Sequence, residues 1–410
     1  MQAVGDAPRP RVVVTGMGAV SAAGLGVEAL WGAALAGRSG VREAELAREG
    51  PNRVKIAAQV SGFRPEEFID AKLLPYCDRF TQFAIVAADQ AVAQAGLSER
   101  CPLGSRAGVT VGTGAGGITT IEELCFTDFV LKGRIDPMAV PRVMISAPAS
   151  HIGIRYGCTG PTFVVSSACA SGAQAIGMAV QLIRAGAIDR AIAGGAESTI
   201  TALNIRAWET LRVLTPDCMR PFSIGRNGTV LGEGAAVFVL ESEAAAYRRG
   251  AISLAEIAGY GTSSDASDIV RPDSDGAVAA ISGAIADADL DPEDISYVNA
   301  HGTGTIANDI TETEALGRVF GSALRRLPVS STKPIHGHTL GAAGAIELAI
   351  TIMAMRSQIA PPTINWLGPD PKVGLDPIPH EARPVPIRAA LSNSFAFGGI
   401  NACLVVVAPQ

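Results

Sequence analysis

The sequence is poor in aromatic and charged side chains: Phe, Trp and Tyr make up 5% of its 410 residues, and Asp, Glu, Lys and Arg make up 18%. The formal net charge is −6 and no basic stripe is present, which argues against a nucleic-acid surface. The seven cysteines are an odd number without CxxC spacing, so neither a disulfide framework nor a zinc site is indicated. This cysteine usage is typical of a reducing compartment.

Long hydrophobic runs are also scarce. The first ten residues, MQAVGDAPRP, lack the apolar segment of a signal peptide. The most apolar long stretch, 341–356, contains Glu347 and is shorter than a membrane span, so we expect a buried helix there. Hydrophobic residues nevertheless make up 48% of the chain, enough for a large core. The sequence therefore predicts a cytoplasmic protein without a membrane segment.

Short β-rich runs alternate with alanine-rich helical stretches along almost the whole chain. The expected strands begin near residues 11, 107, 162, 190, 235, 253, 296, 327, 388 and 402. The expected helices cover 27–37, 81–97, 172–186, 276–288, 309–319 and 342–356. Such alternation is typical of a mostly parallel sheet covered by helices. Because the strand-and-glycine pattern begins again near residue 253, we expect two similar α/β halves packed as one compact body.

Glycine-rich loops follow two of the expected strands, at 16–24 and 112–117. The dinucleotide-binding pattern GxGxxG is not met after Gly16, because Ser21 stands where the third glycine belongs. No acidic residue ends a second strand about 20 residues later, where ribose recognition would require it. We therefore interpret both loops as tight turns.

One cysteine lies where an expected strand turns into a helix. The run SSACASG places Cys169 at this junction, where the helix N-terminus favours the reactive thiolate. Its small neighbours permit a strained turn and close approach of a substrate, and backbone N–H groups there could stabilise an oxyanion. The junction alone fits a nucleophile and a buried structural thiol equally well.

Two of the five histidines lie in small-residue loops directly after expected strands. His301 begins the run HGTGT, and His338 lies in STKPIHGHTLGAAG together with Lys333. Glycine neighbours provide no packing area around an imidazole ring, so these rings are poorly suited to a core. They are well placed to reach a cleft at the carboxyl edge of the sheet, as is Cys169.

Four motifs, in order, resemble those of the β-ketoacyl–acyl carrier protein synthases: VVSSACASG, NAHGTGTIAND, STKPIHGHTLGAAGAIE and SNSFAFGGINA. The resemblance covers nearly the whole chain, and the Cys–His–His set is similar to that of the type I/II, ketosynthase II-like condensing enzymes. It implies a thiolase-like fold, with two pseudo-duplicated halves forming a layered α-β-α-β-α sandwich. Residues 1–252 would carry the nucleophile and the capping and dimer insertions, and residues 253–410 the catalytic histidines.

The resemblance implies decarboxylative Claisen condensation, which extends a fatty-acid, polyketide or polyene chain by two carbons. Cys169 would take the acyl group from acyl carrier protein as a thioester. His301 and His338 would hold the carbonyl of malonyl–carrier protein and stabilise the enolate left by decarboxylation. Lys333 and Glu347 would support the histidines electrostatically. No metal or cofactor is implied, because the loss of carbon dioxide drives formation of the carbon–carbon bond.

The resemblance also implies substrate-binding residues and partners. The backbone N–H groups of Cys169 and Phe397 would form the oxyanion hole for the acyl carbonyl, and Phe397 resembles a gate to the acyl pocket. The implied substrate-binding set is Thr229, Thr303, Thr305, Phe395, Ala396 and Phe397. The implied partners are acyl carrier protein and a second subunit in a homodimer, or a ketosynthase-like partner in a heterodimer.

Several positions depart from the usual family motifs. Ala396 replaces a glycine of the gate loop, and we expect it to restrict loop opening and make the protein choosier about acyl primers. Thr229 replaces a phenylalanine beside the nucleophile, and His336 stands where a small residue is common. Ser223, Asn227 and Ile400 also differ from the usual residues. These departures favour a specialised polyketide or polyene enzyme over a housekeeping one.

Two other functional classes remain open. One is a ketosynthase-like protein that does not elongate, either an acyltransferase or the partner subunit of a heterodimer. Such partner subunits typically lack the nucleophile, so Cys169 argues against that form. The other is a cysteine hydrolase that uses Cys169 with one histidine as base. Two histidines without an obvious carboxylate to orient them fit decarboxylation better.

Overall fold

The computed structural model describes residues 9–48, 50–98 and 100–409. Its centre is an 11-stranded sheet, in which ten strands follow one another and a short strand, β2 (Gly24–Leu25), is paired beside β1. The strand order is β11 (Val329–Ser330), β10 (Ile295–Asn299), β14 (Ala389–Ala396), β15 (Ile400–Val407), β9 (Ala255–Ser264), β1 (Val12–Ser21), β8 (Gly234–Ser242), β7 (Arg190–Glu197), β5 (Ala107–Gly112) and β6 (Thr162–Val165).

The sheet consists of two similar parts that meet where β1 pairs with β9. This junction is short and contains the residue pairs Val13↔Glu256 and Val14↔Ala255. On one side of it lie β1, β8, β7, β5 and β6, and on the other lie β9, β15, β14, β10 and β11. The pairing directions are the same on both sides, counted outward from the junction. The expected duplication is therefore visible in the strand order.

The expectation of a mostly parallel sheet is wrong. Strand β5 runs parallel to β6 and β7, and β10 runs parallel to β11 and β14. The pairs β7–β8, β8–β1, β1–β9, β9–β15 and β15–β14 are all antiparallel. Strands β14 and β15 are joined by residues 397–399 alone, and so short a connection can only join antiparallel strands.

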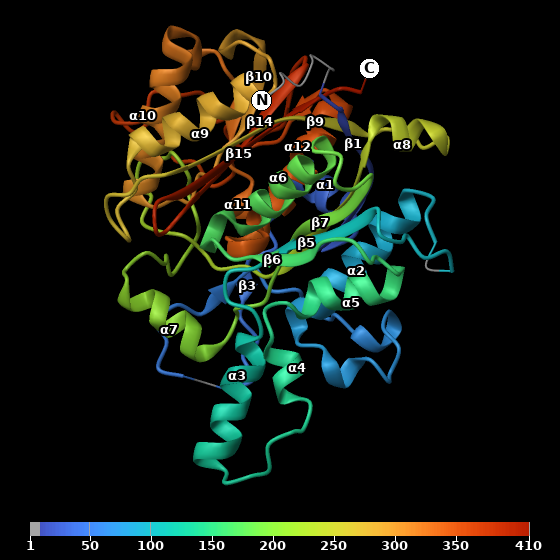
Figure 1. Cartoon of the computed structure of the whole chain (residues 1–410). Helices are drawn as coiled ribbons and strands as arrows, with labels where there is room; N and C mark the ends of the chain where they lie inside the picture. The colour runs from blue at the N-terminus through green and yellow to red at the C-terminus, as the bar shows by residue number, and fades with distance from the viewer. Residues whose placement is uncertain (1–8, 49, 99, 410) are drawn as a thin grey trace.

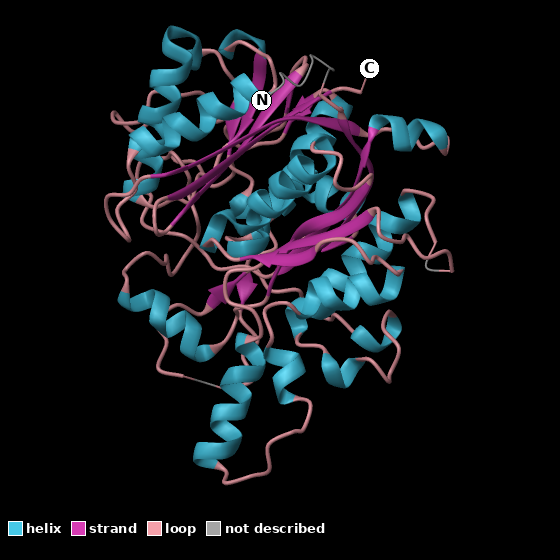
Figure 2. Cartoon of the chain, viewed as in Figure 1, coloured by secondary structure: helices cyan, strands magenta, loops and turns pink. Residues whose placement is uncertain are grey.

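Helices separate and cover the two parts of the sheet, which gives the α-β-α-β-α layers (Figures 1 and 2). Helices α6 (Ser171–Arg184) and α12 (Ala343–Ser357) form the middle layer and contact strands of both parts. Helices α2 (Arg79–Gln94) and α5 (Ala147–Tyr156) cover the outer face of the N-terminal part. Helix α9 (Ser274–Asp287), with α10 (Ile306–Phe320) beside it, covers the outer face of the other part.

Helix α12 lies at the centre of the molecule. The 18-residue stretch Leu340–Ser357 is long and apolar enough to cross a membrane by length and composition alone, but 89% of it is buried inside the protein. All residues from Ala343 to Met355 are buried, because the helix packs on α6 and on both parts of the sheet. The expectation of a buried helix at 341–356 is confirmed.

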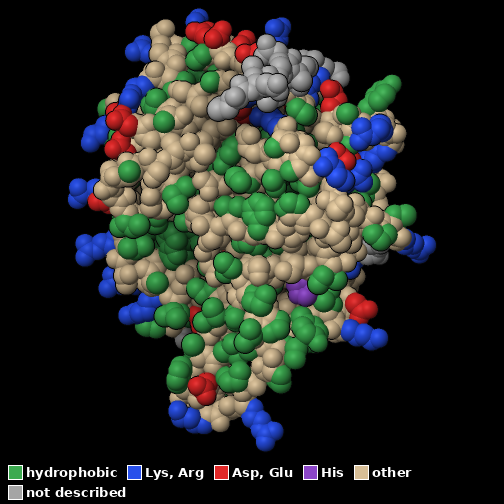
Figure 3. Space-filling view, in the orientation of Figure 1, with side chains coloured by type: hydrophobic (Ala, Val, Ile, Leu, Met, Phe, Trp, Pro, Cys, Tyr) green, Lys and Arg blue, Asp and Glu red, His purple; other side chains and the backbone are tan. Residues whose placement is uncertain are grey.

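A projecting arm, residues 118–146, extends from the N-terminal part, for which the resemblance implied capping and dimer insertions without giving their residues. It contains α3 (Ile118–Cys125), the π-helical segment Phe126–Val130 and α4 (Ala139–Val143). Figure 3 shows hydrophobic side chains gathered over this arm at the bottom of the view. The exposed large hydrophobic residues of the arm are Ile121, Phe129, Val130, Leu131, Ile135, Val140, Met144 and Ile145.

Candidate active site

Cys169 lies in a strained turn between β6 and α6, the 3-10 turn Ala168–Ala170, which we call the cysteine elbow. Ala168 has a φ of 47°, a conformation that is costly for any residue except glycine. The turn is held by Ser171, whose Oγ donates to the Ala168 carbonyl at 2.6 Å and accepts from the Ser167 N–H at 2.9 Å. The elbow therefore fixes the Cys169 side chain at the start of a central helix.

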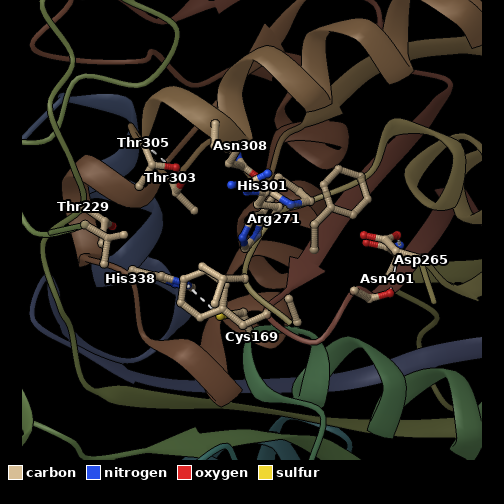
Figure 4. Close-up of a pocket in the computed structure, with 18 of the residues that line it drawn as sticks. Cys169, Thr229, Asp265, Arg271, His301, Thr303, Thr305, Asn308, His338 and Asn401 are labelled. Atoms are coloured by element: carbon tan, nitrogen blue, oxygen red, sulfur yellow. Dashed lines mark hydrogen bonds between the residues drawn. The ribbon is translucent and has the colours of Figure 1, made fainter. Parts of the chain in front are cut away.

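His338 and His301 come from the C-terminal part and meet Cys169 in the same place (Figure 4). The Nε2 atom of His338 lies 3.1 Å from the Cys169 sulfur. The ring centroids of His301 and His338 are 5.4 Å apart, and the rings are nearly perpendicular. The backbone N–H of Phe397 also faces the sulfur. A second 3-10 turn, Leu340–Ala342, follows His338 and leads into α12; we call it the glycine elbow after Gly341.

The Cys169 thiol is protonated in this closed site. Burial raises its pKa to about 12, although the positive charge of Lys333 and the N–H of Phe397 act in the opposite direction. This differs from the expectation that the helix N-terminus keeps a thiolate, because removal of the sulfur from water outweighs the favourable field. Cys169 must therefore lose its proton before it can attack, and the nitrogen 3.1 Å away on His338 is positioned to take it.

Both histidines are neutral near pH 7. Burial lowers the pKa of each ring well below its usual value, and the charge of Lys333 lowers it further. The Lys333 Nζ lies 3.3 Å from Nδ1 of His301. Because an ammonium group can only donate, Nδ1 accepts, and the ring proton of neutral His301 is on Nε2. His301 therefore presents a hydrogen-bond donor to a substrate rather than a positive charge.

Two buried carboxylates support His301: Glu347 acts through Lys333, and Glu312 binds the His301 backbone. Glu347 accepts a hydrogen bond from Lys333 at 2.5 Å, and neither side chain is exposed. Burial raises the pKa of Glu347 to about 7, against the opposing effect of Lys333. Glu312 accepts from the backbone N–H groups of His301 and Gly302, each at 2.8 Å. The sequence pointed to Lys333 and Glu347 but not to Glu312, whose place in a helical pattern gave no signal.

A cavity of about 850 Å³, counted with the open space at its mouth, leads to Cys169. The predicted residues that line it are Cys169, Thr229, His301, Thr303, Thr305, His338, Phe395, Ala396 and Phe397. Lys333, Glu347 and His336 lie outside this lining and are fully buried. The hydroxyl oxygens of Thr303 and Thr305 are 2.9 Å apart.

The sequence did not point to several other residues that line the cavity. These are Trp208, Val213, Asp265, Val270, Arg271, Pro272, Ala307, Asn308, Gly399 and Asn401. Asn308 and Asn401 lie within the motifs NAHGTGTIAND and SNSFAFGGINA, so their motif positions could have identified them. Trp208 stacks on Phe397 with ring centroids 5.7 Å apart, a contact between helix and loop that no local pattern reveals.

The gate loop differs from its expected geometry. Ala396 is the last residue of β14 and is not among the described non-glycine residues with positive φ. The loop residues with positive φ are Gly398 at 86° and Gly399 at 69°. The expected backbone strain at Ala396 is therefore absent in this conformation, because a strand residue at negative φ accepts alanine freely.

Comparisons with known proteins agree with this site. Residues 9–246 match the N-terminal domain of the β-ketoacyl synthases, and residues 254–366 match the C-terminal domain. Nodulation protein E of Rhizobium sp. (strain N33) is 43% identical over 396 residues, which cover 96% of this chain and 98% of that protein. 3-Oxoacyl-[acyl-carrier-protein] synthase 2 of Staphylococcus aureus (strain N315) is 40% identical over 404 residues, covering 96% and 97%.

A solved structure extends the likeness to three dimensions. The ishigamide ketosynthase/chain length factor superposes with a TM-score of 0.94 at 35% identity, covering 98% of this chain and 100% of that one. The sequence match and the superposition both span nearly the full chain. This chain therefore belongs to the β-ketoacyl synthase family of condensing enzymes and has the thiolase-like fold.

Proposed function

We propose that this protein extends an acyl chain by two carbons through decarboxylative condensation with malonyl–acyl carrier protein. The observation that carries the proposal is the thiol of Cys169, 3.1 Å from Nε2 of His338, with His301 beside it in one buried cavity. The chain that is extended would be that of a fatty acid, a polyketide or a polyene. No metal or cofactor takes part in the proposed reaction.

The first half-reaction loads the acyl group. Cys169 gives its proton to Nε2 of His338, and the resulting thiolate attacks the thioester carbon of acyl–carrier protein. The N–H groups of Cys169 and Phe397 would stabilise the oxyanion that forms. The bond from the acyl carbon to the carrier sulfur then breaks, and the carrier thiolate takes the proton from His338. The products are acyl-Cys169 and free carrier thiol.

The second half-reaction makes the carbon–carbon bond. For this step the neutral His338 ring exchanges its Nδ1 proton for one on Nε2 through solvent, and the Nε2–H groups of His301 and His338 then donate to the carbonyl oxygen of malonyl–carrier protein. The electron pair of the breaking bond to the carboxylate flows into this carbonyl, carbon dioxide leaves, and an enolate remains. The enolate carbon attacks acyl-Cys169, and the β-ketoacyl chain leaves on the second carrier protein. Cys169 departs as a thiolate and takes up one proton from solvent, so that the negative charge of the malonyl carboxylate is neutralised.

A cysteine hydrolase is disfavoured by the surroundings of His338. Among the described residues, Nδ1 of His338 has no hydrogen-bond partner. A hydrolase base needs a polar group at that nitrogen to fix its ring and stabilise the cation that forms. The unpaired nitrogen agrees better with a ring that carries a positive charge only during the loading step and donates from Nε2 during decarboxylation.

The proposal is tested by incubating the protein with malonyl–carrier protein, with and without an acyl–carrier protein primer. Measured carbon dioxide and intact masses of the carrier proteins distinguish the alternatives. A condensing enzyme releases carbon dioxide and forms a carrier-bound product two carbons longer than the primer. Acylation of Cys169 without elongation would instead identify a non-elongating acyltransferase, and release of a free acid would identify a hydrolase.

The gate loop gives a prediction with an internal control. We expect Ala396→Gly to change the range of primers loaded onto Cys169 by less than about twofold, because alanine is unstrained there. Gly398→Ala should slow loading, since forcing alanine to positive φ costs roughly 1–2 kcal/mol. A Cβ at Gly398 would meet only Ile269, at 3.8 Å, so this variant isolates backbone strain. Broader loading by Ala396→Gly, measured as acyl mass over short, long and unsaturated primers, would contradict this account.

Arg271 is the only lysine or arginine among the described residues that line the cavity. It would face the phosphate of the carrier protein's phosphopantetheine arm as the arm enters. We expect Arg271→Gln to raise KM about three- to tenfold for acyl-phosphopantetheine, because such charged contacts are worth about 0.7–1.4 kcal/mol. KM for acyl-pantetheine, which lacks the phosphate, should not change. An equal effect on both donors would show that Arg271 does not bind this phosphate.

The proposed partners are acyl carrier protein and a second ketosynthase-type subunit. Strand β6 lies at an edge of the sheet, and the projecting arm exposes apolar side chains, including Phe129 at 70% exposure. An open strand edge and an apolar arm both favour pairing with another chain. We propose a homodimer, with the heterodimer suggested by the ketosynthase/chain length factor structure as the alternative. A monomeric mass in sedimentation of the purified chain alone would favour the heterodimer.

We further propose a cytoplasmic location and a division of the chain near residue 252. All seven cysteines are free in the structure, which supports a reducing compartment. Residues 1–252 carry the nucleophile and the projecting arm, and residues 253–410 carry the histidines. Fractionation of cells and detection of the protein in the soluble fraction would test the location.

A further inference from the structure

The two elbows of the site have the same backbone geometry. Leu340 opens the glycine elbow with a φ of 45°, and Ala168 opens the cysteine elbow with a φ of 47°. Each elbow runs directly into one of the two central helices. In this correspondence Gly341 occupies the position of Cys169. The C-terminal part thus contains a second elbow without a nucleophile, three residues after His338.

A buried carboxylate occupies the space beside Gly341. Glu197 is the last residue of β7 and has no exposed surface. It accepts four hydrogen bonds, each from a group on another segment. The donors are Gly341 N–H at 3.0 Å, Gly114 N–H at 2.6 Å, Ala115 N–H at 3.2 Å and the Thr113 hydroxyl at 3.0 Å. One side chain therefore ties the glycine elbow to the loop that follows β5.

The same loop is tied to the cysteine elbow. The N–H of Thr113 donates to the carbonyl of Val165, the last residue of β6, at 3.1 Å. The Oγ of Ser171, which holds the cysteine elbow, lies 3.4 Å from the Thr113 carbonyl. A chain of polar contacts thus runs from the cysteine elbow through Thr113 and Glu197 to Gly341, in which the Ser171–Thr113 contact at 3.4 Å is the weakest link because the Ser171 proton is donated to Ala168.

The contacts around Glu197 leave no room for adjustment. A Cβ on Gly341 would lie 2.7 Å from Oε2 of Glu197, and a Cβ on Gly114 would lie 2.9 Å from it. Gly195, two residues earlier in β7, packs between the glycine elbow and the first turn of α6: its Cβ would lie 2.6 Å from the Gly341 carbonyl and 3.1 Å from the Gly172 Cα. Three glycines therefore let the end of β7 touch the glycine elbow and the helix that follows the cysteine elbow, and a shift of the carboxylate must move one of these segments.

We propose that Glu197 is a positioning residue that fixes His338 against Cys169 by holding the two elbows in register. Its side chain is not among the residues that line the cavity, so it acts on the reaction through the backbone and not by contact with substrate. The inference depends on the proposed function only in the test that measures condensation. The contacts between Glu197 and the loops around it do not depend on the identity of the substrate.

The chemistry requires a carboxylate at this place. Each oxygen of Glu197 accepts two of the four hydrogen bonds, so an amide would turn its NH₂ group toward two donors in either orientation. Burial raises the pKa of Glu197 to about 7, and the three backbone N–H groups and the hydroxyl act in the opposite direction by stabilising the ionised form. The carboxylate also contributes to the raised pKa of Cys169.

The matched control is Glu241→Gln. Glu241 is equally buried and lies in β8, where it pairs with Arg190 at the far end of β7 from Glu197. It contacts Arg249 and Thr15 and neither elbow. Both variants exchange a buried carboxylate for an amide in adjacent strands, so a general loss of stability affects both.

We expect Glu197→Gln to lower kcat for condensation about 10- to 100-fold, because misplacing catalytic groups by about 1 Å can cost on the order of 10²-fold. KM for carrier-protein substrates should change by less than about twofold, since Glu197 does not touch them. Glu241→Gln should reduce thermal stability but keep kcat within about twofold at 25 °C. A Glu197→Gln enzyme whose kcat equals that of Glu241→Gln would overturn the proposal.

A second variant and a second readout keep the test independent of folding and of substrate choice. Thr113→Val removes one donor, keeps the side-chain shape and should lower kcat about three- to tenfold. Alkylation of Cys169 by iodoacetamide, followed over pH by mass spectrometry, should shift to lower pH in folded Glu197→Gln, because a negative charge near the thiol is lost. An unchanged profile would contradict the placement of Glu197. Since alkylation needs no carrier protein, this result stands even if the proposed condensation fails.

Discussion

Cys169→Ala is expected to abolish transfer of the acyl group from acyl–carrier protein to the enzyme. No other described cysteine lies in a strained elbow against a histidine. Cys77, Cys158 and Cys403 are buried elsewhere, Cys101 and Cys125 are exposed, and Cys218 is partly exposed. Without the thiol there is no nucleophile for the thioester and no acyl-enzyme for the enolate to attack. The measurement is the intact mass of the protein after incubation with acyl–carrier protein.

The control for this variant is Cys101→Ala, which removes an exposed thiol and should leave loading unchanged. A Cys169→Ala protein that still gains the mass of one acyl group would refute the assignment of the nucleophile. Cys169→Gln adds a second test, because a glutamine side chain imitates the acylated cysteine. We expect it to be inactive in condensation and to retain release of carbon dioxide from malonyl–carrier protein.

His301→Ala and His338→Ala are each expected to permit acylation of Cys169 and to reduce decarboxylation of malonyl–carrier protein about 10²- to 10³-fold. The size of the effect is that of removing one donor from a developing oxyanion, about 3–4 kcal/mol. Acylation should be slower in His338→Ala than in His301→Ala, because only His338 lies within 3.1 Å of the thiol. Single-turnover acylation and carbon dioxide release, measured separately, test both statements.

The buried ring of His336 serves as the control for the histidine variants. It lies next to the site but outside the cavity lining, and burial lowers its pKa to about 3. His336→Asn should therefore affect stability more than either partial reaction. Loss of acylation with normal decarboxylation in His301→Ala or His338→Ala would reverse the roles assigned to the two halves of the site.

The strands, the central helices and the reacting side chains could be predicted because their signals are local. Hydrophobic runs marked β6, β10 and β11, and Cys169, His301 and His338 follow the ends of these strands. The direction of the strands could not be predicted, because it depends on whether a connection returns at once, as between β14 and β15, or crosses over a helix. The direction of a strand therefore depends on the connections before and after it and not on the residues of the strand itself.

The supporting residues of the site were harder to predict for a related reason. Glu197 and Glu312 are ordinary glutamates in sequence, and their importance comes from backbone N–H groups on distant segments. The raised pKa of Cys169 likewise depends on how completely the cavity closes over the sulfur, whereas the helix N-terminus is evident from local pattern. Ala396 shows the same limit: its departure from the motif was visible, but its negative φ was not.

The buried middle layer has a consequence for how the chain folds. Helices α6 and α12 each pack on strands of both parts, and every residue from Ala343 to Met355 is covered by protein. Neither part can cover its own inner face, so each would expose a wide apolar surface if it were produced alone. The two parts must therefore gain and lose their structure together, in one cooperative transition. The duplicated chain is thus a single unit of folding, and cutting it between the two parts yields fragments that aggregate unless they meet during synthesis.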